Sequence, residues 1–410
     1  KVSLRGVGHS AGGQSFTPDG IMIDLRELNR LLELDPGRKT VRVQSGATWK
    51  VLTDVLEPHR LAITTKQEFE IFTVGGSVAA NVHGKSVDYG PLIESIESFR
   101  LMKAGGEIVA VSRDENAELF PLVIGGYGLF GVLVDVTFRL VDDRPVEKSE
   151  VVLMNRDPLL ASYCDRIRRA PQDTPLCYGF LDATCTRGFY VTYSYADEYR
   201  SRSLAELKRD EPNPTLFNLL IRLQRWSKSI RRRGFKIMWA GSAKPEITLR
   251  SRRLQLWDEA PRAFQDMLLQ KYFVPIERFG EFARRVGNIF AEYVDDLPLM
   301  TNHFRYVPGN DEAVMSFAPR DSICMIPCYL ANKDSSRWLR KLEEATAKLL
   351  DAALELGGSY YLTFDTIASP EQFQRAYPRW RQFLECKRRI DPDEMFSSLF
   401  YEKYARDQGG

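Results

Sequence analysis

Three glycine-rich segments, which we expect to be loops, lie in the first 131 residues of the chain, at 6–11, 73–77 and 126–131. Glycine has no Cβ, so it lets the backbone approach a phosphate or an aromatic ring closely and adopt positive φ. Successive N–H groups in such a segment can converge on an anion. Three segments of this kind favour a phosphate- or ring-binding site over ordinary turns of a β-rich domain.

The same segments argue against a dinucleotide-binding βαβ unit, which needs a strand, a turn and then a helix that meets the pyrophosphate. Gly12, Gly13 and Pro18 follow the first segment and do not start a helix. The third segment runs into Val132–Phe138, which has strand character. The sequence therefore argues against a Rossmann fold.

The elements that must position these segments are short in the first 140 residues, where strand-like runs alternate with glycine turns. We expect strands at Lys1–Arg5, Ile21–Leu25, Thr40–Val43, Ile93–Met102, Glu107–Ser112 and Val132–Leu140. We expect helices at Thr48–Leu56 and Asn116–Phe120. This pattern predicts an α+β fold.

Longer helical patterns follow in the middle of the chain, at Ile276–Tyr293 and Ser335–Leu356. The tail from Pro370 onwards is helical and aromatic, and Asp391–Asp393, which contains a proline, breaks it. The change of pattern near residue 142 predicts a second domain.

The composition is that of an ordinary globular protein, with 57 basic and 55 acidic side chains in 410 residues. No apolar run reaches the ~18–20 residues that span a bilayer. The formal net charge of +2 argues against general nucleic-acid binding. The six cysteines show no zinc-ligand spacing, so we expect no metal site and reduced thiols in a cytoplasmic chain.

Residues 215–255 depart from this average, because eleven basic side chains stand against one acid, a local net charge of +10. The apolar residues within the stretch recur at helical spacing: Leu219, Leu220, Leu223, Trp226 and Ile230. A basic amphipathic helix is typical of a peripheral membrane contact or an anionic-ligand surface. A solvated helix with one face packed on the body, and a helix that binds a partner, stay open as alternatives.

Four segments together resemble a known family. Arg5–Ser10, Ile21–Leu25, Thr73–Gly76 and Gly125–Val132 match, in order and spacing, the PCMH-type FAD-binding domain of the vanillyl-alcohol-oxidase superfamily. The resemblance implies a flavoprotein with FAD as its cofactor. The family's usual opening βαβ stretch is absent before the first segment, so we expect the natural chain to begin earlier.

The resemblance also implies a domain organisation. An FAD-binding domain is expected at 1–142, an α+β substrate (cap) domain at 143–375, and a C-terminal segment that returns to the FAD domain at 376–410.

The same resemblance implies which residues contact FAD. They are Arg5, Gly6, Val7, Gly8, His9, Ser10, Gln14, Thr73, Gly75, Gly76, Ser77, Asn81, His83, Gly84, Gly128, Gly131 and Val132. Many family members attach FAD covalently through a histidine at the position of His9, whereas the ribose-oxidising branch binds FAD without this bond. A covalent link, a non-covalent contact and a capping role stay open for His9. No cysteine lies near the second segment, which argues against a cysteinyl bond.

The middle region resembles the branch that contains decaprenylphosphoryl-ribose oxidases and sugar-lactone oxidases. Candidate catalytic residues are His83, Lys85, Tyr361 and Asp365, and candidate substrate contacts are His303, Cys324 and Phe364. A histidine can accept a proton near neutral pH, and a lysine can neutralise an anion on reduced flavin or substrate. Structural histidines, a surface lysine and a cysteine that only packs are the alternatives.

One residue departs from the ribose-oxidising branch. Phe364 stands where that branch carries a lysine beside the flavin, so Lys85 or Lys403 would have to supply the cation. Tyr360, Tyr361 and Phe364 indicate an apolar or ring-stacking pocket.

The resemblance implies an oxidoreductase that removes a hydride from a C–H next to an alcohol oxygen, on a sugar- or lipid-linked substrate, and passes it to flavin N5. An amine dehydrogenase or alkene reductase of the same fold and a non-catalytic flavin-binding partner protein are the alternatives. The expected partners are a small-molecule or lipid-linked substrate and a membrane surface at 215–255, with no nucleic acid.

Overall fold

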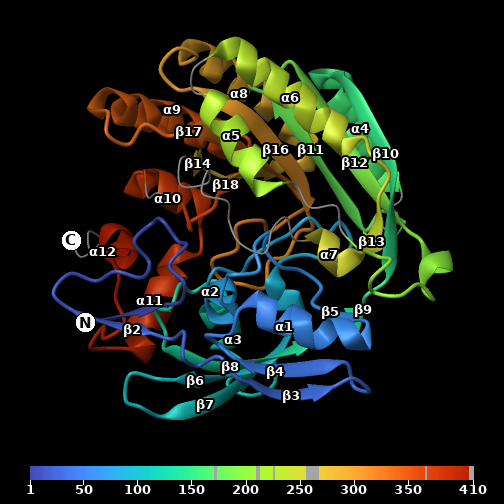
Figure 1. Ribbon diagram of the computed structural model, residues 1–410. Helices are drawn as coiled ribbons and strands as arrows, with labels where there is room; N and C mark the ends of the chain where they lie inside the picture. The colour runs from blue at the N-terminus through green and yellow to red at the C-terminus, as the bar shows by residue number, and fades with distance from the viewer. Residues whose placement is uncertain (170–172, 209–212, 225–226, 255–266, 365–366, 406–410) are drawn as a thin grey trace.

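The computed structural model describes residues 1–405 except 170–172, 209–212, 225–226, 255–266 and 365–366. Two antiparallel sheets organise the molecule, a smaller one built from the N-terminal part and a larger one from the middle of the chain (Figure 1). Helices pack against both sheets. The predicted α+β class is confirmed.

The smaller sheet is built from five strands of the N-terminal part of the chain. Its strand order is β3-β4-β8-β6-β7, and the bounds are β3 Leu31–Asp35, β4 Thr40–Gln44, β8 Val132–Arg139, β6 Ile96–Met102 and β7 Ile108–Ser112. Two short pairs accompany it: the parallel pair β1 Val2–Arg5 with β2 Ile21–Asp24, and β5 Leu61–Ala62 with β9 Val141–Asp142. The third glycine segment leads directly into β8, as predicted.

Three short helices belong to this part: α1 Trp49–Leu56, α2 Val74–Ala79 and α3 Phe120–Val123. Trp49 of α1 packs against Phe138 of β8, with ring centroids 6.0 Å apart. The second glycine segment opens α2 and is not a loop, which corrects the expectation. Gly75 lets this helix approach β4 closely, since a Cβ there would lie 2.8 Å from the Cβ of Ser45.

The expected helix at Asn116–Phe120 is also corrected. Asn116 adopts a φ of 47°, and the helix α3 starts at Phe120 instead. Pro121 lies in the first turn of α3, where a missing N–H is tolerated. The expectation therefore placed this helix about one turn too early.

The larger sheet has the order β13-β10-β12-β11-β16-β17-β15-β18, with β14 also paired to β17. The bounds are β10 Pro145–Asn155, β11 Leu176–Asp182, β12 Arg187–Tyr195, β13 Ile247–Leu249, β14 Met267–Leu269, β15 Tyr272–Pro275, β16 Leu299–Val307, β17 Ser322–Leu330 and β18 Ser359–Tyr360. All described neighbours in this sheet are antiparallel.

Helices lie on both faces of the larger sheet: α4 Arg156–Arg169, α5 Pro214–Gln224, α6 Lys228–Ser242, α7 Arg250–Leu254, α8 Phe279–Glu292 and α9 Ser336–Glu355. Adjacent residues of β12 show the alternation, because side chains of a strand point to opposite faces in turn. Tyr190 packs edge-on against Tyr163 of α4 at 5.6 Å, whereas Phe189 packs against Phe235 of α6, also at 5.6 Å. The face that carries α6 is the face that turns toward the smaller sheet (Figure 1).

The described part of the basic stretch forms three helices, α5, α6 and α7, and the strand β13, rather than the single amphipathic helix that the spacing suggested. Ser227 caps α6 by accepting a hydrogen bond from the Ser229 N–H. Trp226 lies outside the described residues. No described helix is long and apolar enough to cross a bilayer.

The C-terminal tail forms α10 Pro370–Ala376, α11 Trp380–Ile390 and α12 Leu399–Ala405, with the predicted break after Ile390. It packs beside the N-terminal strands, where the Val2 N–H donates to the Met395 carbonyl at 2.7 Å. Phe383 of α11 lies edge-on to Phe130 of the third glycine segment, with centroids 5.0 Å apart. The domain boundaries at 142 and 375 stay predictions.

We predict that Phe383→Ala destabilises the protein by about 3–5 kcal/mol, because it deletes a buried ring and leaves a cavity. The free energy of unfolding in urea measures the effect. Val294→Ala, at an exposed position, serves as the control and should change stability by less than about 0.5 kcal/mol. A loss below about 1 kcal/mol for Phe383→Ala would show that the tail does not pack as described.

Candidate active site

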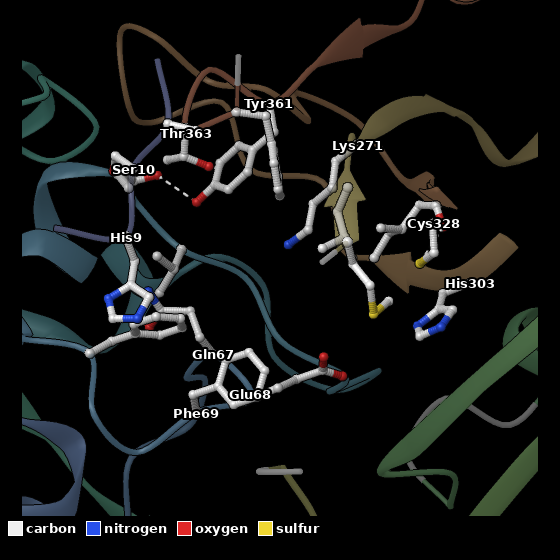
Figure 2. A pocket seen from close by; sticks show the side chains of 18 of the residues that line it. His9, Ser10, Gln67, Glu68, Phe69, Lys271, His303, Cys328, Tyr361 and Thr363 are labelled. Carbon is white, nitrogen blue, oxygen red and sulfur yellow. Dashed lines mark hydrogen bonds between the residues drawn. The ribbon is translucent and has the colours of Figure 1, made fainter. Parts of the chain in front are cut away.

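A cavity of about 1510 Å³ is lined by residues of both sheets and of α5 and α6. Ligand pockets usually have volumes of ~300–1,000 Å³. The cavity therefore has room for a large cofactor together with a substrate. Figure 2 shows His9 and Ser10 on one side of it, His303 and Cys328 on the other, and Lys271 and Glu68 between them.

The glycine-rich segments form one end of the cavity. Of the residues predicted to bind FAD, the following line it: Arg5, Gly6, Val7, Gly8, His9, Ser10, Gln14, Thr73, Gly75, Gly76, Ser77, His83, Gly128 and Gly131. Segments from sequence positions about 120 residues apart thus meet at one wall. This wall is mostly backbone, since its glycines present no side chain to the cavity.

Two glycines near the start of the chain stand where a side chain would collide with a neighbouring segment. A Cβ on Gly6 would lie 2.2 Å from the Thr73 Oγ1, which joins the first and second segments. A Cβ on Gly12 would lie 2.7 Å from the Phe364 carbonyl oxygen. The first segment therefore packs as bare backbone against both α2 and the segment that follows β18.

His9 lies on this wall with its ring edge-on to Phe72, centroids 4.7 Å apart. The residue remains partly exposed, and it is exposed toward the cavity. Partial burial lowers the pKa of His9 below its ordinary value. A neutral imidazole therefore faces the space between the glycine segments at neutral pH.

The opposite end of the cavity is charged. Glu68 lies between two cations, with its Oε1 3.0 Å from the Lys85 Nζ and 3.4 Å from the Arg305 Nη1. Burial raises the pKa of Glu68, but Lys85 and Arg305 outweigh burial and hold the pKa below its ordinary value. Burial lowers the pKa of Lys85 to about 8, against the stabilising charge of Glu68.

Lys271 lies directly before β15 and was not singled out by the sequence; it projects into the same space (Figure 2). Its Nζ lies 5.2 Å from the Tyr361 ring centroid and 5.6 Å from the Phe364 ring centroid. Burial, and then the charge of Arg305, lower the pKa of Lys271 to about 8. Lys271 thus supplies a cation beside Phe364, the position at which the related branch carries a lysine. Lys403, one of the two expected substitutes, does not line the cavity.

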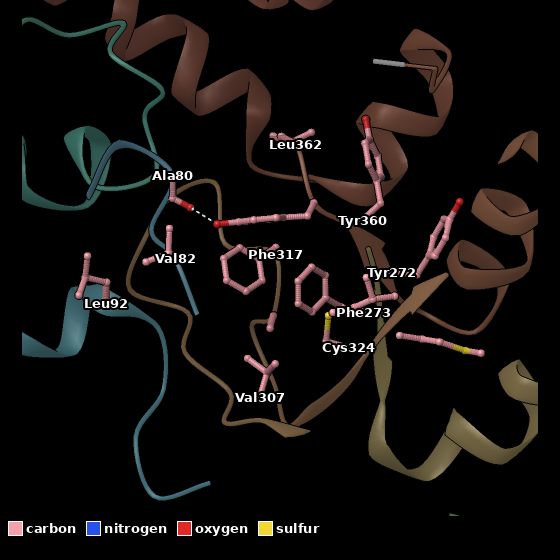
Figure 3. Close-up of a cluster of buried hydrophobic side chains, with 14 of the residues drawn as sticks. Ala80, Val82, Leu92, Tyr272, Phe273, Val307, Phe317, Cys324, Tyr360 and Leu362 are labelled. Carbon is pink, nitrogen blue, oxygen red and sulfur yellow. Dashed lines mark hydrogen bonds between the residues drawn. The ribbon is translucent and has the colours of Figure 1, made fainter. Parts of the chain in front are cut away.

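His83 and Tyr361 belong to an aromatic cluster behind this wall, near the side chains drawn in Figure 3. The His83 ring lies 5.2 Å from Phe273, 5.5 Å from Phe317 and 5.8 Å from Tyr361. Both His83 nitrogens are covered and have no hydrogen-bond partner among the described residues. Burial lowers the pKa of His83 well below its ordinary value, so the ring is neutral.

Tyr361 uses its hydroxyl within the protein, since the hydroxyl donates to the Ala80 carbonyl at 3.0 Å (Figure 3). Burial raises the pKa of Tyr361 well above its ordinary value. The His83 nitrogens are covered, and the Tyr361 hydroxyl is neutral and already hydrogen-bonded to Ala80. Without movement, therefore, neither group can take a proton from a ligand.

His303 of β16 has a different setting, because its ring lines the cavity opposite His9 (Figure 2). The ring lies edge-on to Phe180, with centroids 4.4 Å apart. Burial, opposed by the charge of Glu68, lowers the pKa of His303 to about 4. His303 is therefore unprotonated at neutral pH and faces the space that a substrate would fill.

The placement of Cys324 is corrected. It does not line the cavity but is fully buried on β17, opposite Phe273 on β15. Cys328, four residues further along β17, lines the cavity instead. The strand alternation could have shown that both lie on one face, but not which of them reaches the open space.

Three residues predicted to bind FAD also lie elsewhere. Asn81 accepts a hydrogen bond from the Ile93 N–H through its Oδ1 at 3.0 Å, so it holds a turn. Gly84 passes close to Lys66, whose carbonyl oxygen would lie 2.8 Å from a Cβ. Val132 is buried at the start of β8. Asp365 lies outside the described residues, whereas Phe364 lines the cavity.

Comparison with known proteins identifies the N-terminal part. Residues 1–112 match the family model of an FAD binding domain. The chain is 24% identical to the decaprenylphosphoryl-beta-D-ribose oxidase of Mycolicibacterium smegmatis, over 97% of this chain and 87% of that protein. It is also 24% identical to the L-gulono-1,4-lactone dehydrogenase of Mycobacterium tuberculosis, over 97% and 88%.

A third similarity is local. The chain is 33% identical to cytokinin dehydrogenase 2 of Oryza sativa subsp. japonica over 140 residues, which are 32% of this chain and 25% of that protein. The glycine wall, the size of the cavity and these matches agree on one class of protein, an FAD-dependent oxidoreductase. These similarities match the PCMH-type, or vanillyl-alcohol-oxidase, superfamily of FAD-linked oxidoreductases.

The residues present fit FAD on structural grounds. The wall at Gly6, Gly8 and Gly128 is bare backbone, and both Gly8 and Gly128 have positive φ, of 76° and 78°. The buried Gln14 Oε1 has no partner among the described residues, so an acceptor is directed at this region without a protein donor. FAD is the cofactor, and the first and third glycine segments would hold it.

We predict that Gly6→Ala weakens FAD binding at least tenfold, or about 1.4 kcal/mol, because its Cβ would collide with Thr73. Fluorescence titration of FAD-depleted protein measures the dissociation constant. Gly105→Ala is the matched control, since nothing lies within 4 Å of a Cβ there. Equal affinities for the two variants would contradict the placement of FAD against the first segment.

Proposed function

We propose that this enzyme oxidises an alcohol carbon of a sugar- or lipid-linked substrate. The observation that carries the proposal is the shape of the single large cavity found in the described part of the chain, which joins a glycine wall at one end to a charged, histidine-lined end at the other. FAD at the glycine wall would accept the hydride from the substrate carbon. Relatives named as oxidases and dehydrogenases of a ribose and a lactone support this class of substrate.

The chain's own residues must then place the substrate and take the hydroxyl proton. His303 is the proton acceptor in this proposal, because it is neutral above about pH 4 and faces the cavity opposite His9. The aromatic cluster of His83, Phe273 and Tyr361 excludes water from the neighbouring wall. Lys85 stays paired with Glu68, so it orients charge rather than accepting a proton.

We expect a substrate alcohol to bleach the visible flavin absorbance in the absence of oxygen, and His303→Ala to slow this bleaching by about 10²-fold or more, the usual loss for a general base. His59→Ala is the control, since His59 is exposed in the short helical turn after α1. Bleaching by amines alone would favour the amine dehydrogenase, and oxidation of reduced flavin by alkenes would favour the reductase. Flavin that no substrate bleaches would favour a non-catalytic partner protein.

The pH dependence of the bleaching rate at limiting substrate follows from the pKa values. The rate should fall below about pH 4, as His303 gains a proton and can no longer accept one. It should also fall above about pH 8, as Lys85 and Lys271 lose their protons and the charged end loses its positive charge. A rate that rises steadily through pH 8 would contradict these assignments.

We further propose that FAD is bound covalently through His9. The neutral imidazole faces the cavity at the glycine wall, which is the state in which a ring nitrogen can form such a bond. Acid precipitation should therefore give a yellow, fluorescent protein pellet, and His9→Ala should release FAD to the supernatant. A colourless wild-type pellet would show that the contact is non-covalent.

The helices α5 and α6 support a membrane contact near the cavity. Phe217 and Ile221 line the cavity, whereas Leu219 and Leu223 do not line it and are 53% and 41% exposed. The exposed basic residues on and after these helices are Arg222, Arg233, Lys236 and Lys244. Exposed apolar side chains beside basic ones match the surface of an anionic bilayer.

Part of the local charge of +10 serves the interior. Arg250 is 1% exposed and donates to the Thr64 carbonyl and the Ser86 hydroxyl. Arg252 pairs with Glu57, and Arg253 with Glu246. The charge available to a membrane is therefore that of α5, α6 and Lys244.

We predict co-sedimentation with vesicles that contain anionic lipid, and at least tenfold weaker binding after Leu219→Glu with Leu223→Glu, which place charge on the apolar surface. Added salt should release the protein, because the attraction is partly electrostatic. Val294→Glu, at an exposed site on the turn after α8, is the control. Binding that neither salt nor the double variant changes would contradict the proposal.

A further inference from the structure

The charged end of the cavity carries more positive than negative charge. Lys85, Lys271 and Arg305 line it, and Glu68 is the acid that pairs with two of them. His303 adds no charge at neutral pH, because its pKa is about 4. The inner cluster therefore has a net charge of +2 in a buried setting.

The excess charge is concentrated on Lys271. Lys85 and Arg305 each pair with Glu68, but no hydrogen bond or ion pair joins the Lys271 Nζ to a described residue. Its contacts are the ring faces of Tyr361 and Phe364. A cation–π contact compensates only ~0.5–2 kcal/mol, which is less than the cost of burying an unpaired ion.

We propose that this end of the cavity binds an anionic group of the substrate, a carboxylate or a phosphate, between Lys271 and Arg305. The inference deepens the proposed function and rests on it, because the ligand is taken to be the substrate of the same site. The anion would restore the missing negative charge and receive hydrogen bonds from both side chains.

The two side chains offer complementary donors for such a group. A guanidinium has five N–H donors in a planar fork, and one Arg305 nitrogen is directed at Glu68, 3.4 Å away. An ammonium is a compact point charge that suits a carboxylate or phosphate oxygen. With a pKa of about 8, Lys271 is mostly protonated at neutral pH, and a bound anion would raise that pKa.

The position of Lys271 also determines where the anionic group would lie relative to the reacting carbon. In Figure 2 Lys271 stands between the His9 side and the His303 side of the cavity. A group held there would leave the reacting end of the substrate between the glycine wall and His303. A neutral substrate would leave Lys271 unpaired.

The same cation could instead serve an anionic flavin, so the experiment must separate the two sources of negative charge. The probe is inorganic phosphate, with acetate as a second anion, added to the FAD-loaded protein. Perturbation of the visible flavin spectrum measures binding and requires no turnover. The variants are Lys271→Met, which removes the charge, and Lys271→Arg, which restores a cation.

We expect phosphate to bind wild type, to bind Lys271→Met at least tenfold more weakly, and to bind Lys271→Arg within about threefold of wild type. Lys333→Met is the matched control, because Lys333 is an exposed cation at the rim of the cavity. Its phosphate affinity should equal that of wild type. Retained FAD content and an unchanged unfolding transition establish that each variant is folded.

Two results would overturn the inference. One is an equal phosphate affinity of wild type and Lys271→Met. The other is a lower flavin midpoint potential in Lys271→Met with unchanged phosphate affinity, which would assign the cation to the flavin. Failure of the proposed function is a separate observation, since it appears as flavin that no alcohol bleaches whatever the phosphate affinity.

Discussion

The contact between the first glycine segment and the chain after β18 is the constraint on which the site depends. The Ala11 N–H donates to the Thr363 carbonyl at 2.8 Å, and the Gln14 side chain donates to the Leu362 carbonyl. These residues are about 350 positions apart in sequence. Gly12 permits the approach, because any side chain there would meet the backbone of Phe364. This seam closes the glycine wall against the larger sheet and so defines one continuous cavity.

The cavity has an electrostatic consequence. The segments before and after α2, which carry Glu68 and Lys85, lie against β16 and the start of β15, so Lys271, His303 and Arg305 are removed from bulk water. Burial lowers the pKa of all three bases: it keeps His303 neutral and brings the pKa of Lys85 and of Lys271 toward the physiological range. Burying these ionisable groups costs free energy on folding. It also makes their protonation sensitive to the charge of a bound ligand, as at many enzyme sites.

The sequence predicted the FAD-binding half far better than the charged end, and the reason is physical. Where the backbone itself contacts a cofactor, glycines are required at fixed positions along the chain. Such a pattern can be recognised in the sequence, as at Gly6, Gly75 and Gly128. The helix α2 was read as a loop because its two glycines oppose helix formation locally, whereas packing on β4 favours it. Lys271 carried no signal, since a lone lysine before a strand residue is common and only the tertiary fold turns it inward.

Phe364 shows how the two kinds of information combine. Its identity indicated that a cation expected from the family was missing, and Lys85 and Lys403 were the candidates to replace it. The structure has Lys271, in the residue directly before β15, with its Nζ 5.6 Å from the Phe364 ring. A cation that enters the same space from another part of the chain approaches the site from a different direction and has different neighbours, here Arg305 and Tyr361. Because charge can be conserved in space while its position in the sequence changes, the absence of a motif residue says little about the electrostatics of the site until the fold is known.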